Sequence, residues 1–340
     1  MPRLRYHAGL AWFRCSHAVA VIPRAALWLA LAVGVWPAAG QPPARVATTA
    51  ERPVIRFGFS RQIFDSVNEN DGRAALKMHA EAMGRAENVE IVVTEGMFDG
   101  ADAANRALTA GTVDMMAMPT DEFLALSPAL VTGPLIAVII GGRPDDENLL
   151  VTRGDRGFAD IAALKGRHLL VLGGVKMPFS LIWLDVLALH AGLGPAERAF
   201  GEVTLTLKAS KTVLPVFFGQ ADACVVSRKA LQVMGELNPQ ILRQLRVLAT
   251  SRPFVPSVMC FRAGMARDLI DRVVKAALTL HTTPSGRQLS IIFQSERMEV
   301  VSSASLDDAR ALVAEHDQLL AVYRQSVAPA TGAANFSASN

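Results

Sequence analysis

Short apolar runs of strand type alternate with longer runs of helical spacing along the first part of the chain. The run "VIRFGF" at 54–59 is rich in the β-branched and aromatic residues that favour strands. The run "NDGRAALKMHAEAMGR" at 70–85 repeats its apolar residues every three to four positions. The same pattern predicts strands at 89–94 and 113–118 and a helix at 103–110. Such alternation is typical of a parallel sheet with helices on its faces.

Residues 134–151 interrupt this alternation. Two apolar extended runs flank the polar turn Gly-Gly-Arg-Pro-Asp-Asp without a helix, so we interpret the segment as a crossing into a second lobe. The pattern then predicts strands at 168–173, 202–207 and 223–227, and helices at 179–191, 211–218, 229–236 and from Pro239. Extended runs at 245–251 and 255–261 indicate a crossing back, and helices at 264–281, 285–294 and 306–326 follow.

The chain is therefore predicted to be an α/β protein of two lobes, each a mainly parallel sheet flanked by helices, joined by crossing strands. A cleft between two such lobes can enclose a small ligand. We assign these bounds: lobe 1 at 54–140 plus 262–327, lobe 2 at 141–261, a flexible leader at 41–53, and a disordered tail of small polar residues at 328–340.

The first 40 residues are predicted to be a cleaved secretory signal peptide. Four arginines and no acidic residue precede the apolar stretch "AALWLALAVGVW", and the small residues of Pro37-Ala38-Ala39-Gly40 suit signal peptidase. The stretch is shorter than the about 20 residues that span a bilayer, so an uncleaved anchor is the less favoured alternative. We expect a soluble periplasmic protein that acts as a monomer.

Removal of this segment changes the charge of the protein. Four of the 34 basic residues are lost, which leaves 30 against 31 acidic ones. The basic balance of the full chain thus belongs to the export signal, and we expect no nucleic-acid partner. Cys224 and Cys260, both in strand-like runs of the mature chain, are either two buried thiols or a disulfide that the compartment permits.

One short pattern occurs twice. An apolar helical run ends at Gly111 or Gly219, a polar and a small residue follow, and then Asp114 or Asp222 begins an apolar strand-like run. Glycine permits a left-handed end to a helix, and aspartate accepts backbone N–H groups in turns. Both carboxylates stand at the amino ends of strands, whereas ligands bind beyond the carboxyl ends. We therefore interpret Asp114 and Asp222 as structural.

The carboxyl ends of the strands supply the candidate ligand contacts. Hydroxyl groups and cations gather there, and the cations favour an anionic ligand, although each could instead be a solvated surface residue. The predicted contacts are Ser60, Arg61, Thr120 and Asp121 from lobe 1, and Lys176, Ser180, Ser210, Lys211, Ser227 and Arg228 from lobe 2.

The common catalytic motifs are missing from the sequence. The seven histidines show no metal-ligand spacing, and there is no Gly-x-Ser-x-Gly elbow, Ser-x-x-Lys pair or Gly-x-x-x-x-Gly-Lys loop. We expect neither a cofactor nor a metal, and we expect that the protein is not an enzyme.

The chain resembles the type II periplasmic solute-binding proteins, in particular the phosphate, phosphite and phosphonate receptors of ABC transporters. The resemblance covers about residues 54–325 and implies two lobes that close on a ligand, with the permease and ATPase on other chains. The order and spacing of these segments carry it: "SVNENDGRAALKMHAEAMG", "AGTVDMMAM" with "TDEFLAL", "IAALKGRHLLVLGG", "KASKTVLPVFFGQADACVV", "ELNPQILRQLRVLATS" and "TTPSGRQL".

Two segments depart from the phosphonate receptors that the chain resembles. Their Ser/Thr-rich run after the Leu-Lys-Gly strand is replaced by Val-Lys-Met-Pro-Phe-Ser, which keeps only Ser180, and their Ser-His pair is replaced by Ser210-Lys211. A phosphonate, another oxyanion or a small carboxylate are all compatible ligands. The ligand-loaded form is expected to be read by an ABC permease or, alternatively, by a membrane sensor such as a histidine kinase or cyclase.

Overall fold

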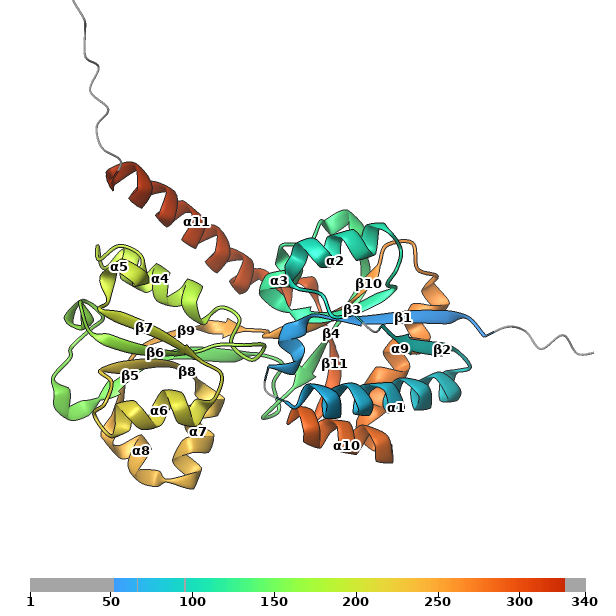
Figure 1. Ribbon diagram of the computed structural model, residues 1–340, viewed down its shortest axis with the longest axis horizontal. Coiled ribbons are helices and arrows are strands. Elements are labelled where there is room, and N and C mark those ends of the chain that lie inside the picture. The colour runs from blue at the N-terminus through green and yellow to red at the C-terminus, as the bar shows by residue number, and fades with distance from the viewer. Residues whose placement is uncertain (1–51, 66, 95, 328–340) are drawn as a thin grey trace, which may run out of the picture. The chain divides into compact units, whose positions relative to one another are not determined.

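The computed structural model describes residues 52–65, 67–94 and 96–327, and its strands form two sheets (Figure 1). The six-stranded sheet has the order β11-β4-β10-β3-β1-β2, and the five-stranded sheet has the order β7-β6-β8-β5-β9. The predicted signal peptide, most of the leader and the tail at 328–340 lie outside the described residues. Within the described part, no helix combines the length and apolar character needed to cross a bilayer.

The six-stranded sheet buries both of its faces. Its strands are β1 (Val54–Phe59), β2 (Glu90–Val93), β3 (Met115–Pro119), β4 (Val131–Ile139), β10 (Ser257–Arg262) and β11 (Arg297–Val301). One face packs on α1 (Glu69–Glu87), α9 (Arg267–Thr279) and α10 (Pro284–Phe293), the other on α2 (Gly100–Thr109) and α3 (Thr120–Leu124) (Figure 1). Successive side chains of a strand point to opposite faces, so Met115 joins the first core and Met116 the second.

The five-stranded sheet forms a single core with its own helices. Its strands are β5 (Asp146–Arg153), β6 (His168–Leu172), β7 (Glu202–Thr206), β8 (Ala223–Ser227) and β9 (Leu245–Phe254). The helices α4 (Ser180–His190) and α5 (Ala196–Ala199) lie on one face, and α6 (Ala209–Phe217), α7 (Arg228–Leu237) and α8 (Pro239–Gln244) lie on the other (Figure 1).

Both sheets are mixed, where mainly parallel sheets were predicted. β1 is parallel to β2 and β3, and β6 is parallel to β7 and β8. The strands that lead from one sheet to the other, β4, β5, β9 and β10, pair antiparallel with their neighbours. The chain leaves the six-stranded sheet through β4 and β5 and returns through β9 and β10, so the outgoing and returning strands run in opposite directions and pair antiparallel. The α/β class and the two sheets are confirmed.

Two elements, β10 and α11, do not pack in the lobe to which the sequence assigned them. β10 pairs with β3 and β4, so the chain returns to the six-stranded sheet at about residue 256 and not at 262. The last helix, α11 (Asp307–Val327), packs along α4 (Figure 1). There His316 Nε2 lies 3.0 Å from Asp185 Oδ2, and Leu312 joins the core of the five-stranded sheet. An apolar pattern shows that an element is buried but not which partner buries it, and the remaining lobe bounds stay a prediction.

The two repeated aspartates are structural, as predicted, but they act between strands. Asp114 Oδ2 accepts a hydrogen bond from the Arg56 amide of β1 at 3.0 Å, and Asp222 Oδ2 accepts one from the His168 amide of β6 at 3.1 Å. The preceding Gly111 and Gly219 have φ of 63° and 73°, the left-handed conformation that the pattern predicted. Each carboxylate thus fixes the start of its strand against the parallel neighbour.

The carboxylate of Asp114 also holds two guanidinium groups. Arg56 Nε donates to Oδ2 at 2.8 Å and Arg262 Nη2 donates to Oδ1 at 2.9 Å. Burial opposes ionisation of Asp114, but the hydrogen bonds from Arg56 and Arg262 outweigh it and lower the pKa of the carboxyl group. The buried Asp114 carboxylate and two partly exposed guanidinium groups therefore tie β1, β3 and β10 together.

Candidate functional site

A cavity of about 1180 Å³ lies beyond the carboxyl ends of β6, β7 and β8 and along one face of the six-stranded sheet. Ligands of open α/β sheets bind at such carboxyl ends. The five-stranded sheet contributes the loops after β6 and β7 and the end of β8, with Gly173, Gly174, Val175, Lys176, Lys208, Ser210 and Ser227 in the lining.

The wall formed by the six-stranded sheet is apolar. It includes Phe57 and Phe59 of β1, Met115 of β3, Met83 of α1 and Phe293 of α10. These side chains belong to the layer between the sheet and the helices α1, α9 and α10. The cavity therefore has a polar side made of loops and an apolar side made of regular elements.

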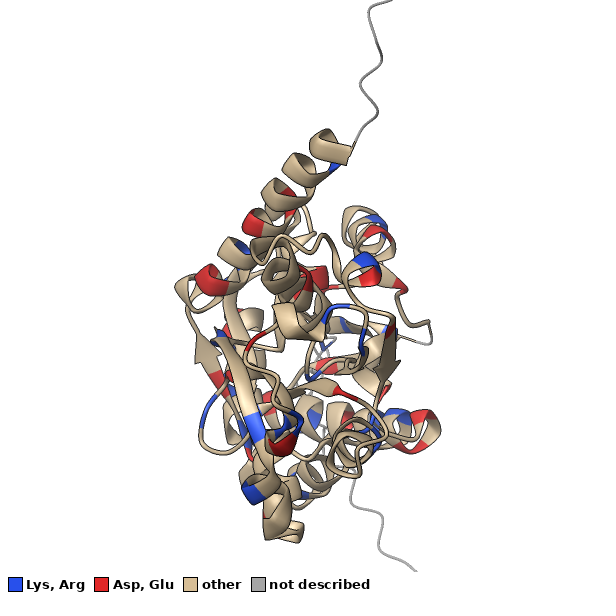
Figure 2. Ribbon diagram, turned by 90° about the vertical axis from the view of Figure 1, so that its left-hand side faces the viewer, with Lys and Arg blue, Asp and Glu red and all other residues tan. Residues whose placement is uncertain are grey.

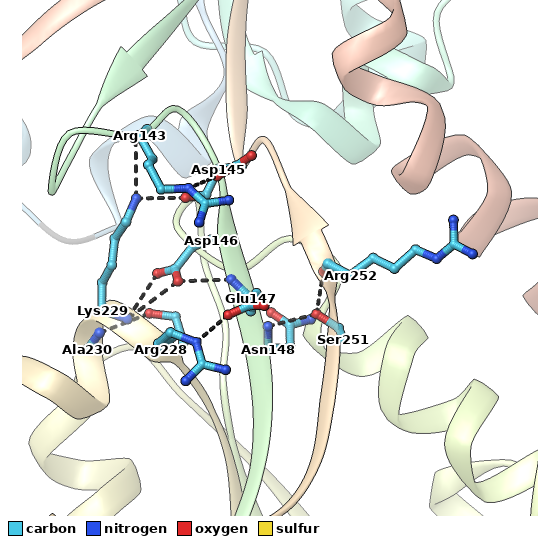
Figure 3. A network of polar contacts seen from close by, with 11 residues as sticks. Arg143, Asp145, Asp146, Glu147, Asn148, Arg228, Lys229, Ala230, Ser251 and Arg252 are labelled. Atoms are coloured by element: carbon cyan, nitrogen blue, oxygen red, sulfur yellow. Dashed lines mark hydrogen bonds and ion pairs between the residues drawn. The ribbon is translucent and has the colours of Figure 1, made fainter.

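Five cations and two acids, Asp65 and Asp146, are among the charged residues of the lining. Three of the cations have acidic or backbone partners. Arg143 Nε donates to Asp145 Oδ1 at 2.8 Å, and Arg297 Nε donates to Glu299 Oε1 at 2.7 Å. Lys229 Nζ donates to the Asp145 carbonyl oxygen at 2.7 Å and to the Arg143 carbonyl oxygen at 3.2 Å (Figure 3). These three side chains therefore already have hydrogen-bond partners within the protein.

Lys176 and Lys208 are the other two cations, and neither has an acidic partner among the described residues. Lys176 Nζ donates to the side-chain oxygen of Gln294, which follows α10, at 2.7 Å. Burial lowers the pKa of the Lys176 ammonium group. Lys208 is exposed at the start of α6. A partly buried ammonium group that hydrogen-bonds only a neutral amide is a ready partner for an anion.

The crossing from β4 to β5 is fastened to the second sheet by a polar network (Figure 3). Arg228, the first residue of α7, forms an ion pair with Glu147 of β5. The backbone amide of Asn148 donates to Ser251 Oγ of β9 at 2.8 Å. Together with the contacts of Lys229, they attach the crossing to the start of α7 and to Ser251 of β9. The crossing segment therefore belongs mechanically to the second sheet.

His79 of α1 faces the apolar side of the cavity. Its side chain is only 6 % exposed, and neither ring nitrogen has a hydrogen-bond partner. Burial lowers the pKa of His79 to about 4, so the imidazole is neutral at pH 7. His281, after α9, also lines the cavity, and its Nδ1 is buried without a partner. Buried polar atoms are normally hydrogen-bonded, so both rings are unusual.

Three of the ten predicted contacts line the cavity, namely Lys176, Ser210 and Ser227. Ser227 is buried, and its hydroxyl accepts the Ala230 amide at the start of α7 at 3.1 Å. Ser210 is exposed on the first turn of α6. Their assignment as ligand contacts stays a prediction.

The other seven predicted contacts lie outside the lining of this cavity. Ser60 is buried and donates to Glu122 Oε1 at 3.0 Å, and burial raises the pKa of Glu122 and of Asp121. Arg61 forms an exposed ion pair with Asp99. The remaining four are two buried hydroxyls, one exposed amine and one guanidinium paired within its own sheet: Thr120, Ser180, Lys211 and Arg228.

The apolar wall and the imidazole were missed by the sequence reasoning. Phe57, Met115 and Met83 follow ordinary strand and helix periodicity, so the pattern marks them as core. His79 carried one signal that could have been used, because it stands at an apolar position of the helix at 70–85. The sequence does not show that the layer around it is open.

The ribbon in Figure 2 shows positions of basic and acidic residues interspersed along the elements seen from this side. Blue and red segments alternate along the helices, and many form pairs such as Arg267 with Asp271. This mixture of signs differs from the basic stripe of a nucleic-acid-binding surface.

Two mixed sheets with a cavity at their strand ends define the class of two-lobe periplasmic solute-binding proteins. Residues 70–306, more than half of the chain, match the family described as "ABC transporter, phosphonate, periplasmic substrate-binding protein". The chain therefore belongs to the phosphonate-binding family of periplasmic substrate-binding proteins, which are components of ABC transporters.

Solved structures agree on the fold. The chain is similar to XAC2383 from Xanthomonas citri bound to ATP, with 17 % identity, a TM-score of 0.58, and coverage of 81 % of this chain and 99 % of that one. It is also similar to PhnD1 from Prochlorococcus marinus in complex with methylphosphonate, with 12 % identity, a TM-score of 0.54, and coverage of 78 % and 98 %. None of the curated proteins matches the chain.

Proposed function

We propose that the protein captures a small anion between its two sheets and delivers it to an ABC-type importer. The observation that carries the proposal is the pair Lys176 and Lys208, which follow β6 and β7 and line one cavity without an acidic partner among the described residues. An anion placed between them would gain hydrogen bonds to two charged donors. Phosphonates, other oxyanions and small carboxylates fit this chemistry, and a relative of this fold holds methylphosphonate.

Binding is proposed to close the two lobes without a chemical step. Lys176 already bonds Gln294 from the other half of the protein, so a ligand at this point contacts both halves at once. Contacts to both halves are complete only in the closed form, and the ligand therefore shifts the population toward it. The predicted signal peptide supports export of the mature chain to the periplasm, where the family acts.

The test uses the chain from residue 41 onward and isothermal titration against phosphate, methylphosphonate, sulfate and small carboxylates. Lys176→Gln and Lys208→Gln should each lower the affinity for the anion that binds by about 10- to 100-fold, because a hydrogen bond to a charged group contributes about 1.5–3 kcal/mol. Lys211→Gln is the matched control, since Lys211 lies on the same helix start as Lys208 but outside the cavity lining.

Lys211→Gln should leave the affinity within about twofold of wild type. An affinity loss for Lys211→Gln equal to that for Lys208→Gln would place the anion on the outer side of α6 and contradict the proposed site. If no anion of the set binds, the proposed function fails.

A further inference from the structure

The cavity is larger and more apolar than a bare oxyanion requires. Cavities of about 300–1,000 Å³ enclose drug-sized ligands, and this one measures about 1180 Å³. The two cations without an acidic partner, Lys176 and Lys208, are on the loop side. The wall between the six-stranded sheet and α1 and α10 presents Phe57, Phe59, Met83 and Phe293. A tetrahedral anion held by Lys176 and Lys208 has no contact to offer to such a wall.

We infer that the ligand is an amphiphilic anion, whose charged head lies between Lys176 and Lys208 and whose apolar chain or ring lies against α1 and the six-stranded sheet. This inference rests on the proposed function and names the substrate class of the same site. An apolar substituent would cover the aromatic side chains of β1 and remove their surface from water.

His79 supports this placement independently of the cations. The imidazole lies in the apolar layer with both ring nitrogens unpartnered, and an unsatisfied buried polar group destabilises the folded protein. A neutral imidazole offers one donor and one acceptor. A hydroxyl, carbonyl or ether oxygen of a ligand chain at this depth would accept the ring N–H, and a hydroxyl would alternatively donate to the other ring nitrogen.

A chain-length series tests the inference with the mature protein. Methyl-, butyl- and octylphosphonate are titrated together with the carboxylates and sulfonates of the same lengths. Affinity should rise with each added methylene, by up to about fourfold if the methylene is fully buried. Met83→Trp, which fills the apolar side, should abolish this gain.

Met78→Trp is the matched control, because Met78 lies on the same helix but is exposed and does not line the cavity. It should keep the full chain-length gain. If short anions bind but affinity stays flat or falls with length, the inference is wrong and the proposed function stands. If no anion of any headgroup or length binds, the proposed function itself fails.

Discussion

Replacement of His79 by leucine should remove most of the acid sensitivity that a buried imidazole gives the wild-type protein. The pKa of His79 is about 4 in the folded protein and 6.5 for an unperturbed histidine. Between these values the unfolded chain binds a proton that the folded protein excludes. The stabilisation is therefore complete above pH 6.5 and is lost as the pH falls toward 4.

The expected magnitude follows from the two pKa values. Going from pH 7.5 to pH 4.5, the wild type should lose about 2.5 kcal/mol of unfolding free energy through this one group. A leucine at position 79 does not titrate, so over the same pH range the variant should lose about 2.5 kcal/mol less unfolding free energy than the wild type. At pH 7.5 the variant should be as stable as wild type or more stable, because leucine removes two unsatisfied polar atoms.

Urea unfolding of both proteins without ligand, at pH 7.5 and pH 4.5, measures the double difference directly. All other titrating groups are shared and cancel. Met78→Leu is the control, because Met78 lies on the same helix, is exposed and does not titrate, so this variant should keep the full acid loss. A double difference below about 0.5 kcal/mol for His79→Leu would refute the desolvated imidazole.

Three further outcomes follow from the described contacts. Asp114→Asn should lower the unfolding free energy by about 2–4 kcal/mol, because it leaves two guanidinium groups without their carboxylate, and a loss below 1 kcal/mol in urea titration would contradict the cluster. Gly111→Ala should cost about 1 kcal/mol through its positive φ alone, since its Cβ would meet open space, whereas Gly96→Ala, equally open but without positive φ, should change stability by less than about 0.5 kcal/mol. Burial raises the pKa of Cys224 and Cys260 to about 12, so neither thiol should react with a thiol reagent at pH 8 until the protein unfolds, and peptide mapping of early labelling at either residue would contradict this.

Most elements could be predicted because their local signals are strong. The strand at 54–59 and the helix after Asn238 begin at the residues that were predicted. An apolar run and an Asn-Pro helix start are signals carried by neighbouring residues, so they can be recognised in the sequence. β11, at 297–301, was missed, because "RMEVV" is short and carries two charges. The pattern also could not assign β10 to its sheet, because pairing depends on contacts between residues far apart in the sequence.

The candidate site was predicted only in part for a related physical reason. Strand ends predicted Lys176, Ser210 and Ser227 as ligand contacts, and these three residues line the cavity. The other side of the cavity is a gap between a sheet and helices, and a gap has no sequence signature. His79 and Lys176 come into one cavity only through the arrangement of both sheets.

The order of strands in the six-stranded sheet determines when the protein can be completed. β10 lies between β3 and β4, although the entire five-stranded sheet intervenes in the sequence. Until β10 has been synthesised, β3 and β4 have no shared neighbour and each presents an unpaired edge. The five-stranded sheet is continuous in sequence, but α4 is covered only once α11 has been made. A chain truncated before these elements would therefore expose strand edges and would be prone to aggregation and proteolysis.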